Sequence, residues 1–230
     1  MRIASLAVWL MLLAAVPAAA DYKSAVAAYE RGDHETAFSE FKRLAEKGNP
    51  KAQGMLASMY EAGTGIERSY AEAFKWYLHA AHKGEVVAQF MVAQMYYEGR
   101  GGPKDYAEAM KWYTIAARGG HVYAQYNLGV LHEQGRGTSP NQAEAFKWFL
   151  KAARGKVPEA QFKVGQCYAN GDGPPQDLVQ GYMWLELAAS NGKQEAAKTR
   201  DAIAAKMTPD QIQRAKEFVR VKSRQKSGAK

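Results

Sequence analysis

The chain has 230 residues, of which 47% are hydrophobic, and a formal net charge of +8. Its only cysteine is Cys167, so an internal disulfide is excluded and packing alone must stabilise the fold. After the first twenty residues, no apolar stretch approaches the ~20 residues that a membrane-spanning helix needs. Basic residues crowd the C-terminal end among Ser and Gly, at Arg220, Lys222, Arg224, Lys226 and Lys230.

The first twenty residues have the order of a cleavable secretory signal peptide. Met1 and Arg2 precede an apolar run over residues 3–16, and Pro-Ala-Ala-Ala follows at 17–20. A membrane anchor is the alternative, but the run is shorter than a spanning helix and small residues follow it. We expect residues 1–20 to be removed after Ala20 and the chain to be exported, to the periplasm or beyond.

A period of 36 residues governs the middle of the chain. Four features keep this step over four copies without a gap, which defines units at 49–84, 85–120, 121–156 and 157–192. They are the Ala-Gln pairs that begin at Ala52, Ala88, Ala124 and Ala160; the Gly-x-Gly motifs that begin at Gly63, Gly99, Gly135 and Gly171; the tryptophans Trp76, Trp112, Trp148 and Trp184; and the Ala-Ala pairs that begin at Ala80, Ala116, Ala152 and Ala188.

Each unit contains two segments with apolar residues at three-and-four spacing, which predicts two amphipathic helices per unit. Neither helix can bury its stripe within one unit, so the units must stack around a continuous core. Residues 21–48 have the pattern of a degenerate N-terminal unit, 193–222 that of closing helices, and 223–230 that of a disordered basic tail. The sequence therefore predicts an all-α solenoid.

The turns repeat as regularly as the core. The first Gly of each Gly-x-Gly suits the left-handed residue that ends a helix. Six residues later a reciprocal capping box is expected to start the second helix, as in Ser69–Glu72 and Asp105–Glu108 and likewise in Asn141–Glu144 and Asp177–Gln180. One equivalent position on the first helix is always small, which predicts close contact of the paired helices: Ala57, Ala93, Gly129 and Gly165.

These motifs resemble the Sel-1-like repeat, a relative of the tetratricopeptide repeat. The resemblance rests on Ala-Gln-Tyr-Asn-Leu-Gly at 124–129, Gly-Arg-Gly at 135–137, Ala-Phe-Lys-Trp at 145–148 and the Ala pair at 152–153. It implies a right-handed α/α superhelix and a role as an adaptor. Lys156 departs from the pattern because a Gly closes the other units, at Gly84, Gly120 and Gly192. The cysteine pairs of the cysteine-rich branch are absent.

The residues that could suggest catalysis have structural explanations in the repeat. The Gly-x-Gly motifs lack the third Gly or the Gly-Lys of nucleotide loops. His79 and His82 occupy a variable helix edge without a third metal ligand. His132 and Cys167 take apolar positions on first helices, where we expect burial. We therefore expect no enzyme activity, no metal and no cofactor.

The resemblance places the first helices on a concave face, where the positions that vary between copies point outward. Phe90, Tyr126 and Phe162 are positional equivalents and are expected to form an aromatic ladder, although burial of Phe90 and Phe162 in the core is an equal alternative. The expected partner-binding residues beside the ladder are Tyr97, Tyr123, Gln94 and Gln166.

The sequence therefore favours an exported scaffold that binds a protein or peptide, with no nucleic-acid partner. One alternative is a cell-wall or β-lactam-related hydrolase, which the resemblance implies because the cysteine-rich branch has been linked to such compounds. Another is contact of the basic tail with an anionic membrane surface, which would weaken with ionic strength.

Overall fold

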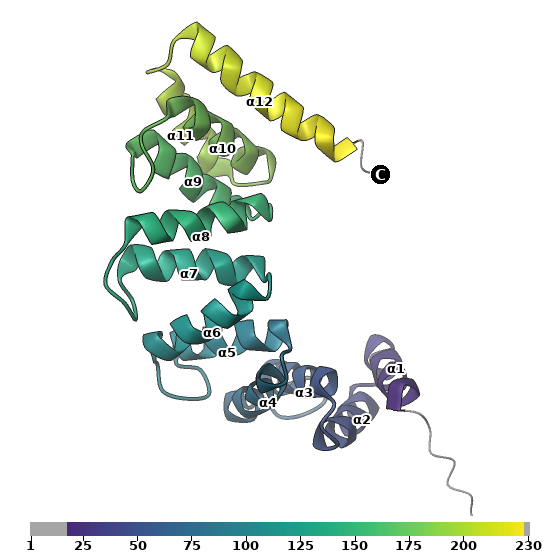
Figure 1. Ribbon diagram of the computed structural model, residues 1–230. Coiled ribbons are helices and arrows are strands. Elements are labelled where there is room, and N and C mark those ends of the chain that lie inside the picture. Colours follow the sequence, from purple (N-terminus) through teal and green to yellow (C-terminus); the bar gives the residue numbers. More distant parts are fainter. Residues whose placement is uncertain (1–17, 228–230) are drawn as a thin grey trace, which may run out of the picture.

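The computed structural model describes residues 18–227, so most of the expected signal peptide lies outside the described residues. Within that range all regular structure is helical and forms an arc, with α1 and α2 at one tip and α12 at the other (Figure 1). None of the described helices is both long and apolar enough to cross a membrane. The helices are α1 (Ala18–Glu30), α2 (His34–Glu46), α3 (Pro50–Ala62), α4 (Tyr70–His82), α5 (Val86–Glu98), α6 (Tyr106–Arg118), α7 (Val122–Gln134), α8 (Gln142–Arg154), α9 (Pro158–Asn170), α10 (Leu178–Ser190), α11 (Gln194–Ala204) and α12 (Pro209–Ser227).

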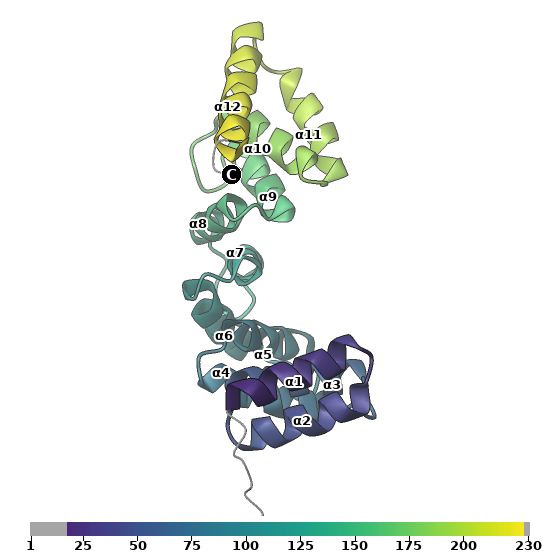
Figure 2. The ribbon, with the colours of Figure 1, turned by 90° about the vertical axis from the view of Figure 1, so that its right-hand side faces the viewer.

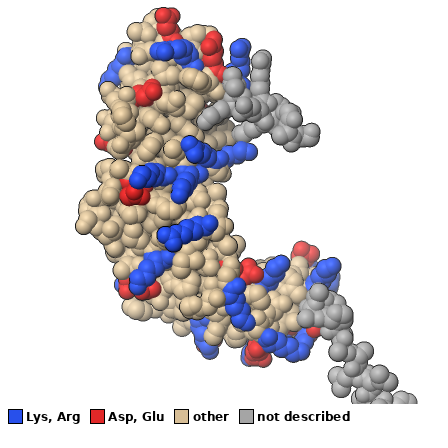
Figure 3. Space-filling model, viewed as in Figure 1, with Lys and Arg blue, Asp and Glu red and all other residues tan. Residues whose placement is uncertain are grey.

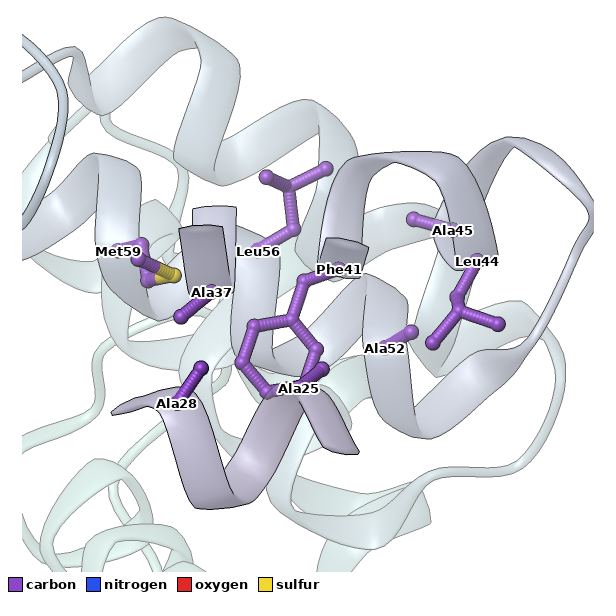
Figure 4. Packing of buried hydrophobic residues seen from close by; sticks show 9 residues of the cluster. All are labelled: Ala25, Ala28, Ala37, Phe41, Leu44, Ala45, Ala52, Leu56 and Met59. Carbon is purple, nitrogen blue, oxygen red and sulfur yellow. The ribbon is translucent and has the colours of Figure 1, made fainter. Parts of the chain in front are cut away.

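The core is shared between neighbouring repeats, as the stacking argument requires. One cluster joins Ala57 of α3, Tyr77 of α4 and Val92 of α5, so it spans two repeats. At the N-terminal tip, Phe41 of α2 is fully buried, and Figure 4 shows its ring between α1, which brings Ala25, and the first full repeat. The all-helical solenoid predicted from the period is confirmed.

The small-residue position on each first helix is a point of close approach. A Cβ atom on Gly129 would lie 2.6 Å from the Phe149 ring, and one on Gly165 would lie 2.6 Å from Cγ of Leu185. Such distances are too short for carbon atoms, so a side chain at Gly129 or Gly165 would force these paired helices apart, whereas the first two repeats accommodate the methyl groups of Ala57 and Ala93. The close contact that the sequence predicted is confirmed.

The two glycines of each Gly-x-Gly have different roles. The first ends the first helix in the left-handed region, with φ of 74° at Gly63 and 75° at Gly99, as predicted. The second packs against the previous repeat: a Cβ on Gly137 would lie 2.5 Å from the carbonyl oxygen of Tyr106, the first residue of α6. This second role sets the distance between neighbouring repeats.

Half of each expected capping box is present. The side chain of Ser69 accepts the Glu72 N–H, and Asp105, Asn141 and Asp177 cap their helices likewise. The reciprocal bond was a wrong prediction, because the Ser69 N–H donates to the Tyr60 carbonyl at 2.9 Å. The freed carboxylates pair with lysines, as Glu72 does with Lys75 at 3.6 Å. A reciprocal box forms only before α12 among the helix starts described, between Thr208 and Gln211.

The glutamine of each Ala-Gln pair ties neighbouring repeats together. Nε2 of Gln53 donates to the Ala45 carbonyl at 3.1 Å, and Nε2 of Gln89 donates to the Ala81 carbonyl at 3.2 Å. Gln125 and Gln161 make the same bond to the carbonyls eight residues before them. Each bond adds a second donor to a carbonyl in the last turn of a second helix, which also accepts a backbone N–H of the following turn. The donor comes from the first helix of the next repeat.

The C-terminal helix α12 closes the stack against α10 (Figure 2). Ala215 is fully buried there, and Ile203 of α11 shares its cluster. Residues 223–227, which we expected to be disordered, are helical, since α12 continues to Ser227. The reason is that no Gly or Pro occurs between Pro209 and Gly228, and Lys, Arg and Gln favour helices.

Lys156 keeps the turn geometry of the glycines that it replaces. Its φ of 67° lies in the left-handed region, where Gly84, Gly120 and Gly192 have φ of 89°, 90° and 100°. The junction after α8 therefore has the same backbone course as the others. A side chain with a Cβ costs about 1 kcal/mol in this region.

Replacement of Lys156 by Gly is expected to raise the free energy of unfolding by about 1 kcal/mol, because it removes this cost. Chemical denaturation of the two proteins measures the difference. Gly120→Lys is the matched reverse change and is expected to lower stability; equal stabilities for Lys156→Gly and the parent would contradict this reading of the turn.

A histidine caps α7 where other first helices have Asn or no side-chain cap. Nδ1 of His121 accepts the Ala124 N–H at 3.2 Å, and the ring stacks on Phe90 with centroids 4.2 Å apart. Burial lowers the pKa of His121 below its ordinary value of 6.5. Since Nδ1 can accept a hydrogen bond only when it is unprotonated, the cap requires the neutral ring.

The His121 cap makes stability depend on pH. Because the pKa is lowered in the folded state, the stabilisation is complete above pH 6.5 and is lost as the pH falls through the folded-state value. In His121→Asn, which keeps a cap that does not titrate, we expect a shallower loss of unfolding free energy between pH 7 and pH 5. Burial also lowers the pKa of His132, so the unfolding free energy of His121→Asn should still fall somewhat with pH. If it fell as steeply as that of the parent protein, the role of His121 would be contradicted.

Candidate partner-binding groove

The first helices carry a row of three pockets at equivalent repeat positions. The α3–α5 pocket has a volume of about 520 Å³, the α5–α7 pocket about 270 Å³ and the α7–α9 pocket about 210 Å³. Glu61, Tyr97 and Glu133 occupy the same repeat position and line one pocket each. We refer to this row of pockets as the groove.

The α3–α5 pocket has apolar walls and a polar floor. Tyr22, Met55, Val87 and Met91 line it, from α1, α3 and α5. On the floor, Glu61 accepts a hydrogen bond from the Tyr77 hydroxyl at 3.0 Å and one from Arg100 at 3.1 Å.

The same contacts explain the titration of Tyr77. Burial, with the negative charge of Glu61 beside it, raises the pKa of the Tyr77 phenol. The hydroxyl therefore stays a hydrogen-bond donor at all physiological pH values. The floor of the α3–α5 pocket combines apolar surface with one oriented carboxylate.

The α5–α7 pocket brings together three of the predicted binding residues. Gln94, Tyr97 and Tyr126 line it with Glu98, Asn127 and Val130. Tyr113 of α6 closes the bottom, as its equivalent Tyr77 does in the α3–α5 pocket. It was missed from the sequence because it lies on a second helix, whereas the binding residues were sought on the first helices. Burial raises the pKa of Tyr113. The pocket thus contains three phenol rings from three different helices.

The α7–α9 pocket is polar and contains the predicted residue Gln166. Lys163 donates to Glu133 at 2.9 Å and joins it in lining the pocket. In the other two pockets an arginine of the following turn donates to the equivalent residue: Arg100 to Glu61 and Arg136 to Tyr97. The equivalent of these arginines here is Asp172, which cannot donate to Glu133. Lys163 supplies the missing cation from α9.

The single cysteine lies in the wall of the α7–α9 pocket. Cys167 is 7% exposed, so the burial that the sequence predicted is confirmed. Burial, with the nearby charges of Asp172 and Glu133, raises the pKa of the thiol to about 11. The sulfur is therefore protonated at neutral pH, whereas a nucleophile would need the thiolate.

The aromatic ladder expected along the groove is broken. Phe162 is 7% exposed and packs with Tyr182, Leu185 and Ala196, so its assignment to the groove was wrong. The closing helices, which do not follow the repeat, cover its ring. Phe90 is half-buried between His121 and Tyr113.

The predicted residues on α5 and α7 differ in exposure. Tyr123 is 52% exposed. Tyr97 is partly covered: its hydroxyl accepts a hydrogen bond from Arg136, and its ring contacts Tyr106 with centroids 5.3 Å apart. Tyr126 is half-buried and tilts against Phe149 at 5.7 Å.

The histidines at positions 79 and 82 lie against tryptophans. The His79 ring is 5.5 Å from the Trp76 ring, and the His82 ring is 5.2 Å from Trp112 of the next repeat. In the part of the chain that the structure describes, no three His, Cys, Asp or Glu side chains come together in a way that could hold a metal ion.

Comparison with known proteins agrees with the repeat geometry. The model of the Sel1 repeat matches four times, at residues 50–85, 86–121, 122–156 and 158–193. The structure of a Sel1 repeat protein from Oxalobacter formigenes is 32% identical with a TM-score of 0.73, and the match covers 82% of this chain and 79% of that one. No curated protein gives a significant match.

A second solved structure is also similar. It is c5321, a protective antigen present in uropathogenic Escherichia coli strains that displays an SLR fold, with 28% identity and a TM-score of 0.78. The match covers 88% of this chain but only 44% of that protein. Together with the four matched repeats, these likenesses show that the chain belongs to the Sel1 repeat family.

Proposed function

We propose that this chain is an exported scaffold that binds a protein or peptide partner in the cell envelope through the groove. Sel1 repeat proteins are typically protein-interaction scaffolds, and the structure has a surface suited to that role. The observation that carries the proposal is the row of three pockets, which recur at one position of successive repeats but differ in chemistry.

Exposed residues on the same first helices support this surface as the binding site; Val87 lines the α3–α5 pocket. Val87 and Tyr123 occupy one repeat position on α5 and α7 and are 62% and 52% exposed. Large apolar side chains with polar neighbours are common anchors of protein contacts. The export part of the proposal rests on the signal-peptide pattern in residues 1–20.

Binding accounts for the chemistry of the groove better than catalysis does. The carboxylates of Glu61 and Glu133 are held by cations, at 3.1 Å from Arg100 and 2.9 Å from Lys163. The Cys167 thiol is protonated at neutral pH because its pKa is raised to about 11. These groups are oriented for recognition and lack the activated nucleophile or shifted acid–base pair that hydrolysis needs.

Site-specific photo-crosslinking in living cells tests the proposal. A benzoylphenylalanine placed at Tyr123 is expected to give a discrete adduct with a partner protein, and fractionation is expected to find it in the envelope. Ile115 is the matched control, because it is 44% exposed but lies on the second helix α6, whereas Tyr123 lies on the first helix α7. Equal adduct patterns from the two positions, or adducts from Ile115 alone, would show that the groove is not the binding site.

A further inference from the structure

The groove is acidic although the protein as a whole is basic. Figure 3 shows one face on which Lys and Arg outnumber Asp and Glu, in keeping with the net charge of +8. In contrast, carboxylates are in slight excess around the three pockets. Glu61, Glu85, Glu98, Glu133 and Asp172 line them with Lys51 and Lys163, and Arg100 and Arg136 contact the lining from the turns. An acidic partner segment would be repelled here, whereas a basic one would be attracted.

The α5–α7 pocket has the chemistry of a cation-binding cage. Tyr97, Tyr126 and Glu98 line it, together with Tyr113, which is 1% exposed and closes the bottom. Gln94 donates a hydrogen bond to Glu98 at 3.0 Å, which orients that carboxylate. Aromatic faces attract ammonium and guanidinium groups, most strongly where water is excluded.

Neighbouring contacts within the protein show that these groups bind cations. The Arg136 guanidinium lies over the rings of Tyr97 and Tyr106, 5.5 and 5.3 Å from their centroids, and donates to the Tyr97 hydroxyl. Arg100 contacts both Glu61 and Glu98. Arg100 therefore carries one positive charge for these two carboxylates.

Carboxylates also act on the tyrosines along the groove. Beyond the effect of burial, Glu85 raises the pKa of Tyr22, Glu98 that of Tyr113, and Glu159 that of Tyr126. Lys193 opposes Glu159 at Tyr126, and Asn127 opposes Glu98 at Tyr113 through a hydrogen bond. At these three tyrosines the acting charges are carboxylates except for Lys193 and the neighbouring phenol of Tyr97, whereas at Tyr77 Arg100 opposes Glu61.

We propose that the α5–α7 pocket receives a lysine or arginine side chain from an extended basic segment of the partner. An apolar side chain of the same segment fills the α3–α5 pocket between Met55, Val87 and Met91. This inference rests on the proposed function and specifies its partner: a peptide segment that combines an apolar residue with basic residues.

Peptide binding to the mature chain tests the charge preference. The probes are three fluorescein-labelled Gly/Ser peptides with one Leu and two variable residues, which are Arg, Gln or Glu. We expect the Arg peptide to bind at low salt at least about tenfold more tightly than the Gln peptide, and the Glu peptide not to bind. A Gln peptide that binds as well as the Arg peptide, or an Arg peptide that does not bind, would overturn the inference.

Variants locate the bound peptide. Glu98→Gln is expected to lower the affinity for the Arg peptide about tenfold. Glu67→Gln makes the same change of charge in an exposed turn and is expected to leave that affinity unchanged. Tyr126→Leu, which keeps the apolar packing but removes the ring, is also expected to lower the affinity for the Arg peptide. Equal losses for Glu98→Gln and Glu67→Gln would mean attraction by net charge alone and would contradict the cage.

The two proposals can fail separately. If the Tyr123 crosslink captures a partner but the Arg peptide shows no preference, the groove binds its partner by other chemistry and only the cage is wrong. If Tyr123 gives no adduct of its own while the Arg peptide binds and responds to Glu98→Gln, the cage exists but does not serve a partner in the envelope.

Discussion

One hydrogen bond between neighbouring units, repeated at four junctions, holds the solenoid in register. The amide of Gln53, Gln89, Gln125 or Gln161 donates to a carbonyl at the end of the preceding second helix, at 3.1 to 3.2 Å. A buried amide N–H without an acceptor costs about 1–3 kcal/mol, so each junction favours the geometry that gives the glutamine its carbonyl. The pockets recur at one repeat position because this geometry recurs.

The glycines and the cations reinforce the same junctions. Gly137 lets its turn rest on the first residue of α6, and Gly129 lets α7 approach the Phe149 ring. Arg100 links residues 39 positions apart by its bond to Glu61. Where Asp172 removes that cation, Lys163 replaces it from a different helix. The scaffold is therefore constant while the side chains in the groove vary, which is how a repeat protein can gain specificity without a change of fold.

The period and the turn residues predicted the helices, the caps and the small-residue contacts, because these depend on neighbours within one repeat. The sequence pattern did not reveal the role of Gln89, since its acceptor lies in the previous repeat. It also missed Tyr113, which enters the groove from a second helix, and misplaced Phe162, which the non-repeating closing helices cover. Contacts across repeat boundaries and at the end of the stack are the ones that a repeat alignment cannot supply.

Spin labels at Lys51 and Glu159, equivalent exposed positions on α3 and α9, can report the register of the stack through the distance distribution between them. In a Cys167→Ala background, the labelled protein is expected to give one narrow distribution. Removal of the junction bonds by Gln89→Leu and Gln125→Leu is expected to broaden or shift it while the helical content is retained. An unchanged narrow distribution would contradict the claim that these glutamines fix the geometry of the groove.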